Sequence, residues 1–320
     1  MDVSASVLAE WMMDVMTIDR RTRAFDALHG LALGDALGSQ FFVPAHRDAL
    51  SRRGLPPGPW QWTDDTEMAC SIVAVLQRCG RIDQDVLAAS FAEHHDFDRG
   101  YGPGMNRLLR LIRHGGAWRE LAVGLFDGQG SWGNGAAMRV APLGAWFGDD
   151  PAEAAAQAAL SAEVTHAHPE GVAGAVAVAV AAALATRPGT PEPRTFLDEV
   201  LSYVPPGRVR HGVWAARGLA HVPHAQIAVR ELGNGRHTSA QDTVPFALWA
   251  AARHLTDYEQ AFWTTAATGG DVDTTCAIVG GIVGAHLGVQ GLPGDWRTTI
   301  EPLPDWTDVA SVSAGREDDQ

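Results

Sequence analysis

The stretch "ATGGDVDTTCAIVGGIVGAHLG" (267–288) predicts a helix at the centre of an α-helical fold. From Asp273 to His286 it carries no charged residue, so the helix is apolar on every side and belongs in a core. Its glycines would let neighbouring helices approach the backbone closely. Two acids, Asp271 and Asp273, stand where this helix would begin.

Helical periodicity recurs along the rest of the chain, whereas strand signals are scarce. In "DALHGLALGDALGSQ" (26–40), leucines fall on two opposite faces, which predicts a helix buried on both sides. Further helices are expected at 86–95, 136–147, 150–164, 171–186, 195–204 and 244–255. Clusters of proline and glycine at 54–60, 187–193 and 205–207 indicate loops between helices rather than domain linkers.

We therefore predict an all-α protein with one compact, orthogonal multi-helix bundle over residues 24–290. Residues 1–23 are expected to form an N-terminal extension. Residues 291–320 are expected to form a C-terminal extension whose end, "SAGREDDQ", is disordered.

Composition limits the possible functions. The 320 residues are 46% hydrophobic and carry a net charge of −14, so nonspecific nucleic-acid binding is not expected. Three cysteines without a CxxC motif argue against a disulfide framework or a zinc site. Cys70 and Cys276 lie in apolar runs and are predicted to pack in the core.

The sequence also predicts a cytoplasmic protein without membrane contact, and a monomer is plausible. The most apolar stretch (171–186) has 16 residues, fewer than the roughly 20 that a membrane span needs. Near the N-terminus, Asp2, Glu10 and Asp14 stand where a signal peptide would have basic and then apolar residues.

A second pair of acids stands in "QWTDDTEMACSIVAVL" (61–76), again just before an apolar run. Thr63 or Asp64 could cap the helix, and acids in a first turn suit the positive end of the helix dipole. Capping alone would explain one such pair.

The repetition of the pattern favours a metal site. Paired carboxylates at the mouths of two buried helices need a compensating charge, and a cation supplies it. Hard oxygen donors favour Mg²⁺ or Mn²⁺ over zinc, and four carboxylates would suit two ions. The candidate ligands are Thr63, Asp64, Asp65, Asp271, Asp273 and Thr274.

Together, "WTDDT" (62–66) and "GGDVDTT" (269–275) resemble the ADP-ribosylglycohydrolase family, the group of the dinitrogenase reductase-activating glycohydrolase. Other motifs resemble this family in the same order: "GLALGDALG" (30–38), "DRGYGPG" (98–104), "GSWGNGAAMRVAPLG" (130–144) and "THAHPEG" (165–171). The resemblance implies an all-α fold, two Mg²⁺ or Mn²⁺ ions, and hydrolysis of ADP-ribose from modified side chains or related acceptors.

The resemblance assigns the six candidate ligands to the two metal-binding segments, with Val272 where the family usually has threonine. It implies that Tyr101 and Gly102 lie near the adenosine side of the pocket and that His166 faces the distal ribose. The predicted substrate loop comprises Gly130, Ser131, Trp132, Gly133, Asn134 and Gly135. Its glycines would expose N–H groups to a diphosphate, and its tryptophan could stack on the ribose. A plain turn and a core histidine are the simpler alternatives.

One position departs from the family. Many members carry a glutamate near the metals where this chain has Phe42. In the family's nitrogenase-regulating branch an aspartate before the "RGYG" loop is implicated in catalysis, and Asp98 resembles it. Asp98 and Asp65 are therefore the candidate catalytic acids, although Asp96 and Asp98 could instead cap the following turn.

The predicted function is a metal-dependent hydrolase that cleaves the C1″ glycosidic bond between ADP-ribose and an ADP-ribosylated protein or other conjugate. Two alternatives stay open: a non-catalytic ADP-ribose-binding protein, which Phe42 would favour, and a phosphohydrolase acting on the diphosphate. The sequence leaves the linkage undetermined.

Overall fold

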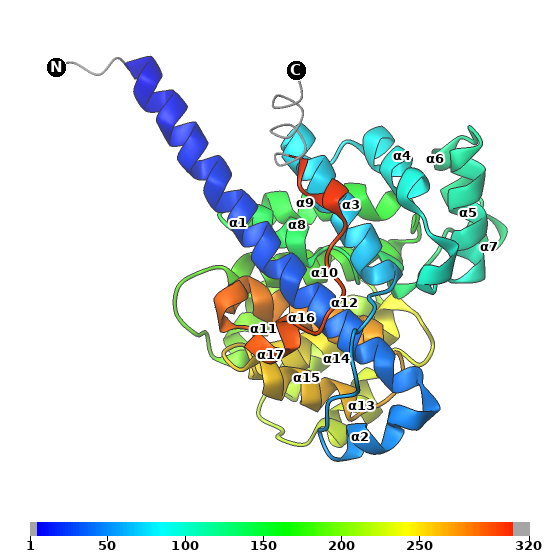
Figure 1. Cartoon of the computed structure of the whole chain (residues 1–320), viewed down its shortest axis with the longest axis vertical. Helices are drawn as coiled ribbons and strands as arrows, with labels where there is room; N and C mark the ends of the chain where they lie inside the picture. Colours follow the sequence, from blue (N-terminus) through cyan, green and yellow to red (C-terminus); the bar gives the residue numbers. More distant parts are fainter. Residues whose placement is uncertain (1–4, 310–320) are drawn as a thin grey trace.

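Helix α16 (Val272–Leu287) lies in the interior of the molecule and packs along α1 (Ala5–Ser39), which is the longest helix in the view of Figure 1. The computed structural model describes residues 5–309, with side chains from residue 20 onward. Within these residues the regular elements are helices and two isolated β-bridges, which confirms the predicted all-α class.

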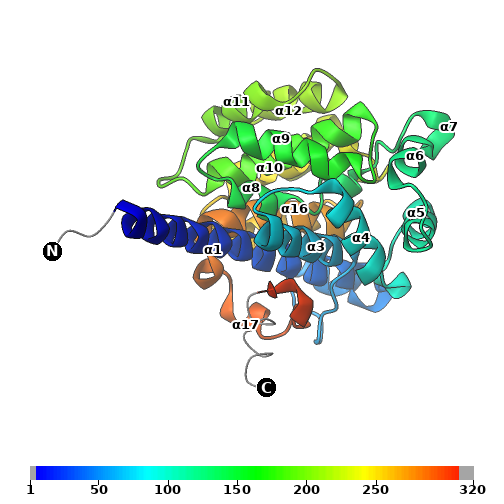
Figure 2. The ribbon, with the colours of Figure 1, turned by 90° about the horizontal axis from the view of Figure 1, so that it is seen from above.

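The remaining helices surround this pair. They are α2 (Arg47–Ser51), α3 (Asp64–Cys79), α4 (Gln84–His94), α5 (Pro103–Arg113), α6 (Trp118–Val123), α7 (Leu125–Gly128), α8 (Ala141–Trp146), α9 (Pro151–Glu163), α10 (Pro169–Ala185), α11 (Pro193–Tyr203), α12 (Arg208–Gly218), α13 (Ala225–Leu232), α14 (Ala240–Arg253), α15 (Tyr258–Ala266) and α17 (Gly294–Arg297). Figure 2 shows α11 and α12 on one side of the body, α17 on the opposite side, and α4 to α7 at one end.

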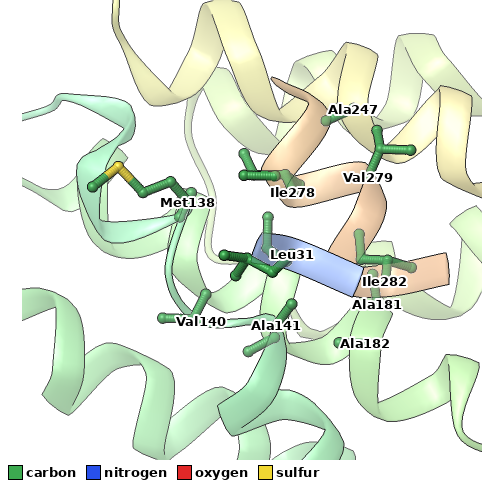
Figure 3. Packing of buried hydrophobic residues seen from close by; sticks show 14 of the residues in the cluster. Leu31, Met138, Val140, Ala141, Ala181, Ala182, Ala247, Ile278, Val279 and Ile282 are labelled. Carbon is green, nitrogen blue, oxygen red and sulfur yellow. The ribbon is translucent and has the colours of Figure 1, made fainter. Parts of the chain in front are cut away.

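The core forms where α1, α8, α10, α14 and α16 meet. Figure 3 shows Leu31 of α1 beside Ile278 and Ile282 of α16, with small side chains from the neighbouring helices around them. The leucines on both faces of α1 between 28 and 37 are buried, as the sequence predicted. Cys70 and Cys276 are also buried and unpaired, which confirms their packing role.

Most predicted helices are present, with one correction. The helix expected at 136–147 begins only at Ala141, after a short 3₁₀ turn at Asn134–Ala136. Pro142 lies in its first turn, where the missing N–H is tolerated, whereas deeper inside a helix it would remove a hydrogen bond.

Part of each predicted extension belongs to the helical body. Helix α1 begins at Ala5 and runs without a break through the predicted boundary at residue 24. The C-terminal segment binds the chain before α3, because Trp60 N–H donates to Thr299 O (2.9 Å) and Glu301 N–H donates to Trp60 O (2.9 Å). The predicted disorder of "SAGREDDQ" lies outside the described residues. Over residues 5–309, no helix combines the length and hydrophobicity needed to cross a bilayer.

The close approach of α1 and α16 depends on glycine. A Cβ atom at Gly34 would lie 2.1 Å from the carbonyl oxygen of Cys276, and one at Gly30 would lie 2.3 Å from that of Gly280. Both contacts are with backbone, so a rotamer change cannot relieve them.

We expect Gly34→Ala to destabilise the protein by about 3 kcal/mol, because the two central helices must separate to admit the methyl group. Urea denaturation followed by circular dichroism measures the change. The control is Gly218→Ala at the end of α12, where a Cβ meets no atom within 4 Å. Equal stability of the two variants would contradict the prediction.

Candidate functional site

An aspartate of α1 anchors the N-terminal end of α3. Thr63 is the N-cap of α3. Asp35 is fully buried and accepts four hydrogen bonds, from the N–H groups of Thr63 (2.8 Å) and Thr66 (3.2 Å) and from their hydroxyls (2.8 and 2.6 Å). This carboxylate orients the first turn, which carries Asp64 and Asp65. Sequence reasoning missed Asp35, although an acid inside the apolar run "GLALGDALG" was a usable signal.

The N-terminal end of α16 lies beside the N-terminal end of α3. Asp271 is its N-cap residue, and the side-chain amide of Asn134 donates to its carboxylate (2.6 Å). Asp273 accepts from the N–H of Thr274 (2.7 Å). The Thr274 hydroxyl donates across to Oδ1 of Asp65 (3.4 Å), so the two predicted segments meet.

Burial raises the pKa of all four carboxyl groups. Burial raises the pKa of Asp64 to about 8, with a further contribution from the charge of Asp35. Burial and the neighbouring acids raise the pKa of Asp65 and Asp273 well above their ordinary values. The Oδ2 atom of Asp65 is buried and has no hydrogen-bond partner within the described part of the chain. Ionising all four acids together would therefore require a positive charge beside them.

A pocket of about 450 Å³ opens over these carboxylates. Eleven of the predicted residues line it: Asp64, Asp65, Gly102, Ser131, Gly133, Asn134, Gly135, His166, Asp271, Asp273 and Thr274. Sequence reasoning missed other lining residues, among them Gly100, Met105, Phe126, Met138 and Thr238. Residues from seven separate segments therefore form one cavity.

Five predicted residues lie outside this lining: Thr63, Asp98, Tyr101, Gly130 and Trp132. Thr63 turns its hydroxyl to Asp35 instead. Trp132 packs against Phe126, with ring centroids 4.8 Å apart, and Phe126 is 53% exposed on the pocket wall. Trp132 therefore contacts Phe126, which lines the pocket, without lining the pocket itself.

Tyr101 and Asp98 belong to the segment that joins α4 to α5. The buried Tyr101 donates its hydroxyl to Glu67 of α3 (2.6 Å), an acid that also accepts from the N–H of Asp96 (3.1 Å). Asp98 is exposed, and its N–H donates to the capping carboxylate of Asp96 (3.0 Å). The sequence left open that both acids cap the following turn; in the structure Asp96 is the N-cap residue.

The glycine-rich loop is fixed on both sides. Asn134 N–H donates to Thr238 O (3.1 Å), and Ala240 N–H donates to Trp132 O (3.0 Å). On the other side His166 presses against the loop: a Cβ atom at Gly135 would lie 2.8 Å from its ring, and one at Gly133 would lie 3.2 Å from it. Glycine is required here by close approach, which a plain turn would not need.

His166 is held neutral by a buried chain of contacts. Arg139 is fully buried and donates to the hydroxyl oxygen of Thr165 (2.9 Å), whose hydroxyl lies 2.8 Å from Nδ1 of His166. Burial, together with the smaller effect of the Arg139 charge, lowers the pKa of His166 to about 3. When the Thr165 hydroxyl donates to Nδ1, the ring N–H is on Nε2, the nitrogen that lies against Gly133 and Gly135 of the loop.

The donor set fits a hard divalent cation by its chemistry. The acids supply only oxygen donors, and the buried Oδ2 of Asp65, which has no hydrogen-bond partner among the described residues, is available to a cation. The side chains are not drawn together as a metal cluster: among the described residues no three acidic, histidine or cysteine groups are gathered as metal ligands would be.

The sequence pattern of the ADP-ribosylglycohydrolase family matches residues 16–318, and the chain belongs to this family. ADP-ribosylhydrolase ARH3 of Danio rerio is 28% identical, with 97% of this chain and 93% of that protein aligned. ADP-ribosylarginine hydrolase Tri1 of Serratia proteamaculans (strain 568) is 25% identical over 86% of this chain and 74% of its own.

A solved structure described as an ADP-ribosylglycohydrolase-related protein complex has the same fold. It superposes with a TM-score of 0.66 at 28% identity, over 91% of this chain and 96% of that chain. The predictions of family, fold and enzyme class are therefore confirmed.

We expect Asp35→Asn to destabilise the protein by about 3 kcal/mol. Asparagine has one acceptor oxygen, so its NH₂ group would face donors of Thr63 or Thr66 that now bond to a carboxylate oxygen. Urea denaturation measures this change. Asp26→Asn, on the same helix, is the control, since Asp26 accepts one bond, from Val289 N–H (2.8 Å), that an amide oxygen can keep. Similar losses in both variants would contradict a special role for Asp35.

Proposed function

We propose that this protein is a metal-dependent ADP-ribosyl hydrolase that cleaves the C1″ glycosidic bond between ADP-ribose and its acceptor. One observation carries the proposal: the acids of two helix mouths, the glycine-rich loop and His166 line a single pocket. The acids suit a ribose held through its hydroxyls. The loop's N–H groups other than those of Gly133 and Asn134, which bond within the chain, suit a diphosphate.

Two divalent ions, Mg²⁺ or Mn²⁺, would be held by Asp64, Asp65, Asp271 and Asp273, together with oxygens of Thr63 and Thr274. Thr63 would have to share its hydroxyl with Asp35, whereas Thr274 already faces the pocket. Bound ions would supply the positive charge that keeps the carboxylates ionised and polarises nearby oxygens.

Asp65 is the better candidate for the proton acceptor. It is buried, lines the pocket and has an oxygen free to accept a proton from water, whereas Asp98 is exposed and lies outside the lining. Phe42 stands at the position of the family glutamate, is 49% exposed and also lies outside the lining. This position therefore supplies no carboxylate to the pocket. A carboxylate acting on water matches the general base of glycoside hydrolysis.

The remaining groups would hold the substrate. The Nε2–H of His166 would donate to an oxygen of the substrate, and the loop between Ser131 and Gly135 would fix the diphosphate. Phe126 offers an apolar face to a planar base. Fixing both ends of the nucleotide keeps C1″ in the reacting geometry. Activity in the cytoplasm and a monomeric state stay predictions from the sequence.

Calorimetric titration of ADP-ribose tests the proposal, first with Mg²⁺ or Mn²⁺ and then with EDTA. We expect binding that is lost in EDTA, and free ADP-ribose as the product from at least one member of a panel of ADP-ribosyl conjugates. Absence of binding under both conditions would refute the proposal. AMP with ribose phosphate would favour the phosphohydrolase alternative, and binding without any product would favour a non-catalytic binder.

A further inference from the structure

A second hollow lies outside the pocket, between the end of α4 and the outer face of α5. This groove has a volume of about 820 Å³, and its walls include Phe97, Pro103 and the three arginines of α5. Figures 1 and 2 show α4 and α5 next to each other at the edge of the molecule, away from the core helices. We call it the arginine groove.

The groove is positive in a chain whose net charge is −14. Arg107, Arg110 and Arg113 are the only ionisable side chains of α5. Arg107 and Arg110 are exposed and about one helical turn apart, so they project to the same side. Neither side chain has a hydrogen bond or ion pair within the described part of the chain.

The other charges of the groove are already engaged. Arg113 donates to the carbonyl oxygen of His95 at the end of α4 (2.8 Å). Asp96, the one acid in the groove, accepts from Asp98 N–H (3.0 Å) and lies 3.6 Å from Nε of Arg99. Arg107 and Arg110 are therefore the two cations left to meet a ligand.

The floor of the groove is preformed. The side-chain amide of Asn106 donates to Tyr101 O (2.7 Å), so its oxygen faces His95, whose Nε2 donates to it (2.7 Å). Tyr101 in turn donates its hydroxyl to Glu67 of α3 (2.6 Å). The groove is thus tied to the helix that carries the pocket's first acid pair, and it needs little reorganisation to bind a partner.

The groove begins at the carboxylate end of the pocket. Pro103 lines both hollows, and a Cβ atom on Gly100 would lie 3.7 Å from Oδ1 of Asp64. Phe97 stands three residues before that glycine, is 71% exposed and lines the groove. An acceptor joined to a ribose at the carboxylates would leave the pocket toward this aromatic ring and the arginines behind it.

We propose that the arginine groove binds an acidic peptide segment next to the modified residue of a protein acceptor. This inference rests on the proposed function. Guanidinium groups pair well with carboxylates, and Phe97 offers an apolar contact near the point of attachment. A peptide is favoured over a nucleic acid because two unpaired arginines neutralise about two phosphates, while the negative protein repels a polyanion as a whole.

Fluorescence anisotropy with short labelled peptides that carry no ADP-ribose tests the groove without requiring turnover. At about 50 mM salt, we expect an acidic peptide to bind about fivefold more tightly than a neutral peptide of equal length. The double variant Arg107→Glu/Arg110→Glu should reverse this preference. The double variant Arg78→Glu/Arg81→Glu changes the net charge equally, on exposed arginines at the far end of α3, and should preserve it.

The affinity for free ADP-ribose, measured in the same variants, should stay unchanged and separately reports on the proposed function. Equal binding of both peptides to the unmodified protein would overturn the inference, as would a preference that survives in Arg107→Glu/Arg110→Glu. A single-stranded oligonucleotide that binds more tightly than the acidic peptide, and is lost in that variant, would overturn it in favour of a nucleic-acid acceptor.

Discussion

Replacing Asp65 with asparagine is expected to lower the release of ADP-ribose by about 10³-fold without unfolding the protein. Asparagine has the same shape but cannot accept the proton from water or bind a cation with a carboxylate charge. The buried Oδ2 of Asp65 has no partner now, so its replacement breaks no hydrogen bond at that atom. Turnover of the best conjugate in the panel measures the loss.

The matched control is Asp98→Asn, which makes the same replacement of carboxylate by amide at the other candidate acid. Asp98 is exposed and outside the pocket lining, so we expect turnover within about twofold of the unmodified protein. An equally large loss in Asp98→Asn would contradict the assignment of the proton acceptor to Asp65. Thermal denaturation in EDTA would separate loss of activity from loss of fold.

The Asp65→Asn substitution also tests the electrostatics of the site. Burial and neighbouring acids raise the pKa of Asp65 above its value in the unfolded chain. The native state then binds more protons than the unfolded state, so without metal its stability falls as pH rises above the ordinary range of aspartate. We therefore expect Asp65→Asn to be at least as stable as the unmodified protein in EDTA at pH 8, and a lower melting temperature there would contradict this.

The sequence predicted the two helix mouths because their acids interrupt long uncharged runs, a signal that survives without any three-dimensional information. It predicted the class of fold for the same reason: helices that are apolar all round must pack against other helices. The single acid in the run of Asp35 was a signal for a buried polar contact, but it does not identify the partners. Only the crossing of α1 and α3 shows the four donors that Asp35 serves.

Contacts between distant segments were also beyond the sequence. The pairing of Asn134 with Thr238 joins a glycine-rich loop to a segment about a hundred residues away that has no motif of its own. Asp98 was chosen by its position in a motif, yet the short 3₁₀ turn there leaves it exposed. Motifs identified which residue types the pocket uses, whereas the packing of helices decided which of them face it.

Thr165→Val is expected to lower kcat/KM about tenfold or more, because it breaks the chain that fixes the protonation of His166. Arg139 can only donate, so the Thr165 oxygen accepts from it, and we assign the hydroxyl proton to the contact with Nδ1 of His166. Without the hydroxyl, Nδ1 loses its donor, and the imidazole is free to move its proton from Nε2 to Nδ1. The pocket would then face a ring nitrogen that accepts instead of donating.

Thr165→Ser keeps the hydroxyl and is the matched control, with kcat/KM expected within about threefold of the unmodified protein. The ¹⁵N shifts of the imidazole report the tautomer directly: we expect an Nε2–H ring in the unmodified protein and in Thr165→Ser, and a mixture in Thr165→Val. Wild-type kcat/KM in Thr165→Val, together with an unchanged tautomer, would show that Thr165 does not control His166.

The pH dependence gives an independent check of the same contacts. The pKa of His166, about 3 in the folded protein, is below the ordinary value of 6.5 because the ring is buried and faces Arg139. The unfolded chain therefore binds the extra proton below about pH 6.5, so His166 costs stability as the pH falls from there toward 3 and costs nothing above that range. We expect the ring signals of His166 not to titrate between pH 5 and 8. A midpoint inside that interval would mean that the ring is solvated or paired with an acid, and the donor role of Nε2 would then depend on pH.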